Sequence, residues 1–266
     1  MTVFTHVKQE DAQKLKDLGF LASEPKSTYE VIRYTKGNVT ATLYTSGKLF
    51  LQGKEKDVEK IAEKLEGIGK KQEKIHFRKE EGWMIGSDES LKGDTFGGIT
   101  IAAVKADAKL RQKLEKLGVA DSKKLSDAEV QRLAEEIKRL VPCEVTSLLP
   151  EEYNTYKGVT MLLNKYHQKL AQDLQGGIHV VDEYPGCTVG NIRETKAESK
   201  YLEVAAASIL ARSAALSQIA FLSTQAGFEL PKGSTHVKEA LERMKKEKQD
   251  FRKFVKLHFK NVAQYL

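Results

Sequence analysis

The chain has 266 residues, of which 40% are hydrophobic and 30% are charged. That length suffices for one large domain, or for a large and a small one, each with an ordinary core. No apolar run reaches the ~20 residues of a membrane span, and the N-terminus lacks the features of a secretory signal. We therefore expect a cytoplasmic protein that does not bind a membrane.

The net charge of +7 is concentrated in the C-terminal segment. Residues 231–266 contain ten Lys and Arg against four Asp and Glu, which gives +6 of that total. A modest positive charge by itself is equally compatible with a nucleic-acid partner and with an ordinary solvated surface. Its concentration in one segment favours a nucleic-acid partner. Cys143 and Cys187 lie at no metal-ligand or redox spacing, which indicates reduced thiols.

Residues 1–65 have the pattern of a small α+β domain. We expect a helix over 9–18, strands near 39–44 and 49–51, and a helix over 58–65. In the first of these strands, the polar residues Thr40, Thr42 and Tyr44 alternate with apolar ones, so they share one face. That face is either a half-solvated sheet surface or a platform for a nucleic-acid duplex.

Residues 66–82 have no sustained apolar period and are predicted to be a linker. From residue 83 onward the pattern is that of a larger α/β domain with basic C-terminal helices. Its predicted strands precede and alternate with helices, which indicates a mixed sheet covered on both faces. The expected strands are 84–88, 97–104, 144–148 and 178–182, and the expected helices are 127–140, 158–174 and 199–223.

Acidic residues occur where predicted buried strands end. Asp88 and Glu89 follow the first strand of this domain, Asp182 closes a later one, and Glu198 precedes an alanine-rich helix. Each acid by itself could be a turn residue or a helix cap. If the fold brings the four together, their oxygens form a site for Mg²⁺ or Mn²⁺ and for phosphodiester chemistry.

Three motifs and a C-terminal signature carry a resemblance to a known family. They are Gly86-Ser87-Asp88-Glu89 with Gly93-Asp94-Thr95-Phe96-Gly97, Asp121-Ser122-Lys123-Lys124-Leu125-Ser126, Thr195-Lys196-Ala197-Glu198-Ser199, and Leu257-His258-Phe259-Lys260-Asn261. In these the chain resembles bacterial ribonuclease HIII, of the type 2 ribonuclease H superfamily. The N-terminal unit is similar to that family's TATA-binding-protein-like domain.

The resemblance implies a ribonuclease H-like fold and an endonuclease that cuts the RNA strand of RNA–DNA hybrids, leaving 5′-phosphate and 3′-hydroxyl ends. It implies catalysis with two divalent ions, Mg²⁺ or Mn²⁺, about 4 Å apart. Asp88 and Asp182 are expected to be direct ligands, completed or oriented by Glu89 and Glu198. The residues expected to bind substrate are Ser90, Lys92, Gly93, Lys123, Lys124, Thr40, Thr42 and Tyr44.

Two residues depart from the family pattern. Leu91 stands where the family has glycine, and Gly98 stands where it has proline. A leucine there either obstructs the loop backbone or adopts a positive φ. Two alternatives follow for a protein that we expect to be a monomer: incision at single ribonucleotides in duplex DNA, as type HII enzymes perform, or binding of hybrids without cutting.

Overall fold

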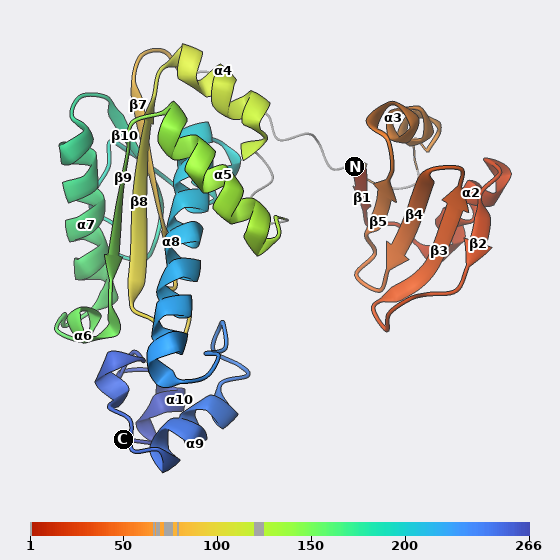
Figure 1. Ribbon diagram of the computed structural model, residues 1–266. Helices are drawn as coiled ribbons and strands as arrows, with labels where there is room; N and C mark the ends of the chain where they lie inside the picture. The colour runs from red at the N-terminus through yellow and green to blue at the C-terminus, as the bar shows by residue number, and fades with distance from the viewer. Residues whose placement is uncertain (1, 66, 68–69, 72–76, 79, 120–124) are drawn as a thin grey trace. The chain divides into compact units, whose positions relative to one another are not determined.

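The computed structural model divides the chain into two compact units, Met1–Lys74 and Ile75–Leu266 (Figure 1). The division falls inside the segment 66–82 that the sequence predicts as a linker. Part of that segment is regular, because β6 (Lys70–Lys71) pairs with β1 (Thr2–Thr5). The structure describes residues 2–65, 67, 70–71, 77–78, 80–119 and 125–266.

The N-terminal unit is an antiparallel sheet in the strand order β2–β3–β4–β5–β1–β6. One face of the sheet packs on the helices, and β4 contributes Val39, Ala41 and Leu43 to that core. The predicted helix over 9–18 is interrupted at Gln13. Besides β1 and β6, the elements are α1 (Gln9–Ala12), α2 (Lys14–Asp17), β2 (Leu21–Ser23), β3 (Glu30–Lys36), β4 (Val39–Tyr44), β5 (Leu49–Gln52) and α3 (Glu55–Lys64).

The opposite face of β4 carries Thr40, Thr42 and Tyr44, as the alternation predicts. Thr42 is only 1% exposed, and its neighbours in register are Arg33 of β3 and Phe50 of β5. The expectation that Thr42 lies open to a substrate is therefore wrong: larger side chains on the adjacent strands cover a short one. Thr40 and Tyr44 are half-buried.

The C-terminal unit contains a mixed sheet in the strand order β11–β10–β7–β8–β9. β10 is parallel to β7 and to β11, whereas β8 is antiparallel to β7 and to β9. The strand predicted over 178–182 is confirmed at the same residues. The five strands are β7 (Met84–Ser90), β8 (Ile99–Ala106), β9 (Cys143–Leu148), β10 (Ile178–Asp182) and β11 (Ile192–Glu194).

Helices cover both faces of this sheet, as the sequence predicts (Figure 1). On one face lie α4 (Ala108–Leu117), α5 (Asp127–Leu140) and α8 (Leu202–Ala226). On the other lies α7 (Val159–Leu174), with α6 (Pro150–Tyr153) beside it. The two faces have separate cores because successive residues of β8 point to opposite sides of the sheet.

The long helix α8 packs closely against β7. A Cβ atom on Gly86 would lie 2.3 Å from the main-chain nitrogen of Val204, so only glycine permits this approach. By length and composition α8 could cross a membrane. Most of its residues are instead buried in the structure, which is the environment of a core helix.

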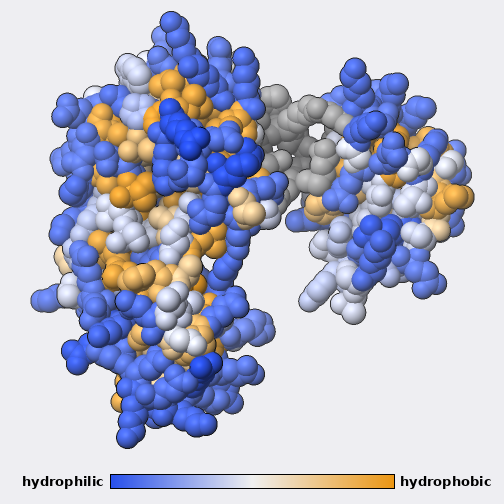
Figure 2. Space-filling model, in the orientation of Figure 1, coloured by the Kyte–Doolittle hydropathy of each residue, from blue (hydrophilic) through white to orange (hydrophobic). Residues whose placement is uncertain are grey.

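The C-terminal segment forms a third hydrophobic core with the end of α8 and the loop after β7. Its outer side is mostly hydrophilic, as the blue surface at the C-terminal end in Figure 2 shows. The predicted basic C-terminal helices are therefore present and well solvated. They are α9 (Lys238–Lys246), the 3₁₀ turn η3 (Phe251–Lys253) and α10 (Lys260–Ala263).

Candidate active site

Two neighbouring parallel strands bring Asp88 and Asp182 to one edge of the sheet. The last residues in the pairing of β7 and β10 are Ser87 and Val181. Asp88 and Asp182 each follow one residue later, on the face that α8 covers, because side chains alternate along a strand. The sequence predicted both acids at strand ends, and the structure places them side by side.

Asp88 is buried, with 9% of its surface exposed. Its carboxylate accepts a hydrogen bond of 2.8 Å from the main-chain N–H of Glu89 and another from the Ser208 side chain of α8. Burial, followed by the charges of Glu89 and Asp182, nevertheless raises the pKa of Asp88 well above its ordinary value. The site therefore holds an excess of negative charge that a proton or a cation would relieve.

Glu198 lies on the 3₁₀ turn η2 (Ala197–Ser199), which contacts the end of β10. The main-chain N–H of Ala197 donates a hydrogen bond of 2.8 Å to Asp182 Oδ1. The turn that carries Glu198 is thus tied to Asp182. Glu183, the next acid after Asp182, is exposed and belongs to the other face of the strand.

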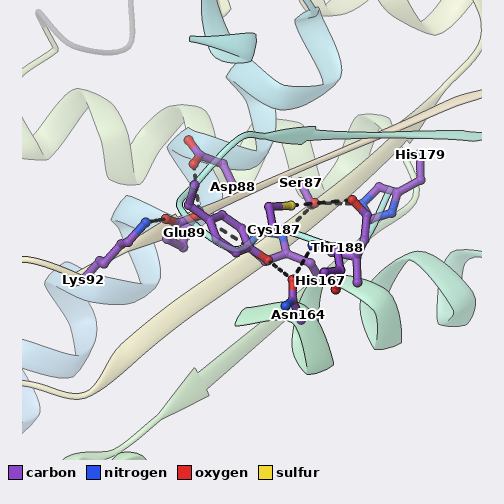
Figure 3. A network of polar contacts seen from close by, with 11 residues as sticks. Ser87, Asp88, Glu89, Lys92, Asn164, His167, His179, Cys187 and Thr188 are labelled. Atoms are coloured by element: carbon purple, nitrogen blue, oxygen red, sulfur yellow. Dashed lines mark hydrogen bonds and ion pairs between the residues drawn. The ribbon is translucent and has the colours of Figure 1, made fainter. Parts of the chain in front are cut away.

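Glu89 points to the α7 side of the sheet, away from Asp88 (Figure 3). Lys92 Nζ lies 2.9 Å from Glu89 Oε1, and His167 Nε2 of α7 lies 3.3 Å from Glu89 Oε2. Burial alone would raise the pKa of Glu89, but the contact with His167, its charge and that of Lys92 outweigh burial, so the pKa of Glu89 is lowered.

The acids are therefore split between the two faces of the sheet. Among the described residues, no three carboxylate, imidazole or thiol groups converge closely enough to hold a metal ion. The donors are nevertheless all carboxylate oxygens, which suit hard divalent cations. The described residues therefore fit such an ion but supply only part of its ligands, because only Asp88 and Asp182 converge.

The loop after β7 contains the other predicted substrate contacts. Ser90 and Lys92 are half-buried and Gly93 is exposed, with no atom within 4 Å of the place a Cβ would occupy. Lys92 Nζ also lies 4.9 Å from the centre of the Tyr184 ring. Leu91 has a φ of 68°, so the backbone keeps the left-handed conformation that normally favours glycine.

The buried side chain of Lys256 stabilises this loop. In the sequence analysis, Lys256 was counted only as part of the basic C-terminal segment. Its side chain is fully buried, and Nζ donates hydrogen bonds to the main-chain oxygens of Asp94 and Gly97 at 2.6 and 3.0 Å. Burial lowers the pKa of Lys256 to about 7, although the charge of Asp94 opposes the shift. No local pattern distinguishes this lysine from its solvated neighbours.

Basic side chains gather at the start of α5, next in sequence to the predicted pair Lys123 and Lys124. That pair itself lies outside the described residues. Arg212 of α8 forms an ion pair of 3.0 Å with Asp127, and Lys232 forms another with the same carboxylate. The structure thus adds two cations, Arg212 and Lys232, neither of which was among the predicted substrate contacts.

Comparison with known proteins identifies the family to which this fold belongs. The model of the ribonuclease HII family matches residues 85–262. The ribonuclease HIII of Protochlamydia amoebophila is 35% identical, with 93% of this chain and 91% of the relative covered. That of Streptococcus gordonii is 32% identical, with 86% and 84% covered.

Comparison with solved structures gives the same family. The crystal structure of Bst-RNase HIII in complex with Mn²⁺ is 29% identical, with a TM-score of 0.66 over 99% of this chain and 97% of that chain. Aquifex aeolicus RNase H3 is 28% identical, with a TM-score of 0.58 over 96% and 98%. The fold is therefore ribonuclease H-like, which defines the class of protein as a nuclease.

Within that class, the chain belongs to the ribonuclease HIII group of the ribonuclease HII family. The protein is accordingly a hydrolase, an endoribonuclease that acts on RNA–DNA hybrids. The expectations of fold and enzyme class from the sequence are confirmed.

Proposed function

We propose that Asp88 and Asp182 bind a divalent metal ion at the carboxyl edge of the sheet, and that Glu89 and Glu198 complete or orient this site. The observation that carries the proposal is the position of Asp88, which is buried and experiences the negative charges of Glu89 and Asp182. Like charges in a poorly solvated place are costly unless a cation compensates them. The Mn²⁺ complex of Bst-RNase HIII supports a divalent ion here.

Asp88 and Asp182, completed by Glu89 and Glu198, would hold two ions of Mg²⁺ or Mn²⁺, which would supply activation of a water and stabilisation of the departing 3′-oxygen in an in-line phosphodiester cleavage. The protein contributes orientation. Main-chain N–H groups of Glu89 and Ala197 hold one oxygen each of Asp88 and Asp182, which orients the two carboxylates. Cleavage in this manner leaves a 5′-phosphate and a 3′-hydroxyl.

The substrate is held by cations around this edge. Lys92 lies in the loop beside Glu89, while Arg212 and Lys232 lie near the start of α5. The predicted pair Lys123 and Lys124 would extend this group of phosphate contacts. We propose that 2′-hydroxyl groups in the shallow minor groove distinguish the RNA strand from DNA, with Ser90 and Gly93 of the loop close to it.

A three-substrate assay tests the proposal. The protein is incubated, with Mg²⁺ or Mn²⁺, with a labelled RNA–DNA hybrid, a DNA duplex containing one ribonucleotide, and plain duplex DNA. We expect cutting of the hybrid above all. Preferential incision of the single ribonucleotide would favour the type HII alternative, and retention of hybrid without products would favour a binding protein.

Two variants test the acids against a matched control. D88N and D182N should abolish turnover and leave hybrid binding largely intact, because each removes one ligand charge and keeps the side-chain shape. E183Q makes the same kind of change at the exposed neighbouring acid and should keep wild-type activity. Undiminished cutting by D88N or D182N would contradict the metal site.

We propose that the N-terminal unit increases affinity for the hybrid through the face of β4 that carries Thr40 and Tyr44. Y44A in the full chain should raise KM several-fold and leave kcat nearly unchanged. Affinity should also fall steeply with salt, because phosphate neutralisation releases counterions. An unchanged KM would exclude Tyr44 from substrate binding, and a flat salt response would exclude binding led by phosphates.

We also propose that the protein acts in the cytoplasm, where Cys143 and Cys187, both free in the structure, stay reduced. We propose a monomer, and light scattering should then give a mass near 29.8 kDa.

A further inference from the structure

A buried series of polar contacts runs from Glu89 along the α7 face of the sheet (Figure 3). His167 Nε2 lies 3.3 Å from Glu89 Oε2, and His167 Nδ1 lies 2.7 Å from Ser87 Oγ. The same hydroxyl lies 2.8 Å from His179 Nε2 of β10. Exposed fractions are 0% for Ser87 and His167 and 6% for His179, so water does not supply alternative partners.

The two atoms at the Glu89 end depend on each other. Glu89 Oε2 and His167 Nε2 are both buried, and neither makes a well-directed hydrogen bond to any other described atom. Each would otherwise be a buried polar atom without a partner, which costs about 1–3 kcal/mol. The contact therefore favours one orientation of the carboxylate.

The rest of the series fixes the imidazole of His167. His167 Nε2 contacts Glu89, and His167 Nδ1 shares one hydrogen bond with the Ser87 hydroxyl. The same hydroxyl shares a second hydrogen bond with His179 Nε2. Burial and the charge of His167 lower the pKa of His179 to about 4, which keeps that ring neutral near pH 7.

We propose that His167, held by Ser87 and His179, is a positioning residue that fixes Glu89 for divalent metal binding. The inference rests on the role proposed for Glu89. His167 itself is on the α7 side of the sheet and touches the carboxylate rather than the substrate. Lys92 holds the other oxygen, Oε1, at 2.9 Å, but its side chain is 36% exposed, so the buried contact with His167 is the more rigid of the two.

Outer partners of ligand side chains commonly contribute about 10- to 100-fold to metal affinity or activity. A loss of that size is expected when the Nε2 contact is removed. The KM for the hybrid should stay within about twofold, because His167 is fully buried and cannot reach nucleic acid.

Two variants of His167 separate positioning from packing. H167Q keeps a donor at the place of Nε2 and can still reach Glu89, whereas H167N keeps a polar group only at the place of Nδ1 and can reach Ser87 alone. Both remove the imidazole at the same buried position, so each is the control for the other. The primary measurement is the affinity of the protein for Mn²⁺ alone, by isothermal titration calorimetry.

We expect H167Q to bind Mn²⁺ within about threefold of the wild type and H167N to bind about 10- to 100-fold more weakly, with kcat following the same order. Equal Mn²⁺ affinity of the two folded variants would overturn the inference. S87A serves if either variant does not fold. It removes one hydroxyl, and unchanged Mn²⁺ affinity and kcat in S87A would equally overturn the inference.

E89Q tests the proposed role of Glu89 separately from the positioning role of His167. Loss of activity in E89Q together with equal behaviour of H167Q and H167N leaves Glu89 in its role and overturns only the positioning by His167. Full activity and full Mn²⁺ affinity in E89Q would overturn the role of Glu89, and the inference with it.

Discussion

The main-chain N–H of Ala197 is hydrogen-bonded to Asp182 Oδ1 at 2.8 Å, and this bond ties the turn that carries Glu198 to the end of β10. The far side of the same segment is anchored by Arg78, whose guanidinium donates to Glu194 at 2.7 and 3.0 Å and to the Tyr201 hydroxyl at 2.8 Å. Glu198 is thus held between two fixed points.

Removal of the Arg78 anchor should loosen this segment. R78M leaves Glu194 with Lys200 and Tyr201, so we expect the free energy of unfolding to fall by only about 1 kcal/mol, because Arg78 is half exposed. We expect kcat to fall several-fold as Glu198 becomes less well placed. Urea unfolding and steady-state kinetics measure the two effects. R193M, in the neighbouring β11, is the control, and an equal loss in that variant would contradict an anchoring role.

Metal binding should stabilise the folded protein. At an ion concentration about 100 times Kd, the free energy of unfolding should rise by about 2.7 kcal/mol. In the absence of metal, D88N should be more stable than the wild type, because it removes one of several crowded charges. Its free energy of unfolding should rise little when Mn²⁺ is added. Thermal unfolding with EDTA and with Mn²⁺ measures both. E183Q should respond as the wild type does, and an undiminished Mn²⁺ effect in D88N would exclude Asp88 as a ligand.

At position 91, substitution by glycine should destabilise the protein less than substitution by alanine, which is the reverse of the usual order. The Leu91 side chain is 7% exposed and packs in the core with Phe96 and Ile219, so either truncation should cost about 2–5 kcal/mol. L91G recovers about 1 kcal/mol of that loss because glycine adopts the positive φ without strain, and L91A does not. The expected order of stability in urea is wild type, L91G, L91A. An L91A protein at least as stable as L91G would show that backbone strain at this position is negligible.

The buried Lys256 should give the stability a specific pH dependence. Its pKa in the folded protein is about 7, below the ordinary 10.5. Between these pH values the unfolded chain binds a proton that the folded protein does not, so folding becomes more favourable as pH rises, by about 1.4 kcal/mol per pH unit. Below pH 7 both states are protonated and this contribution is constant.

K256M removes that contribution. The free energy of unfolding of the wild type relative to K256M should therefore be flat below pH 7 and rise above it, as measured by urea unfolding at several pH values. K253M, which changes an exposed lysine in the same segment, controls for the loss of one positive charge. A difference between the wild type and K256M that does not change with pH would show that Lys256 titrates normally.

Local sequence patterns predicted several elements well. Strand β10 and helix α5 span the predicted residues, and α5 begins with a capping box between Ser126 and Glu129. The short strands of the N-terminal unit were harder to predict. β3 was not predicted, and the helix predicted over 9–18 is interrupted. Elements this short depend on packing with the rest of the unit for their stability more than on their own periodicity.

The sequence by itself determined which acids stand at strand ends and, through its motifs, the family of the protein, because both are recorded in neighbouring residues. Only the tertiary structure decided that Asp88 faces α8 while Glu89 faces His167, that Leu91 keeps a left-handed backbone, and that Thr42 is covered. The first outcome depends on the register of β7 with β10, some ninety residues apart. The second depends on packing against the C-terminal segment, and the third on the strands beside β4. Contacts between such distant segments leave no periodic signal in the chain.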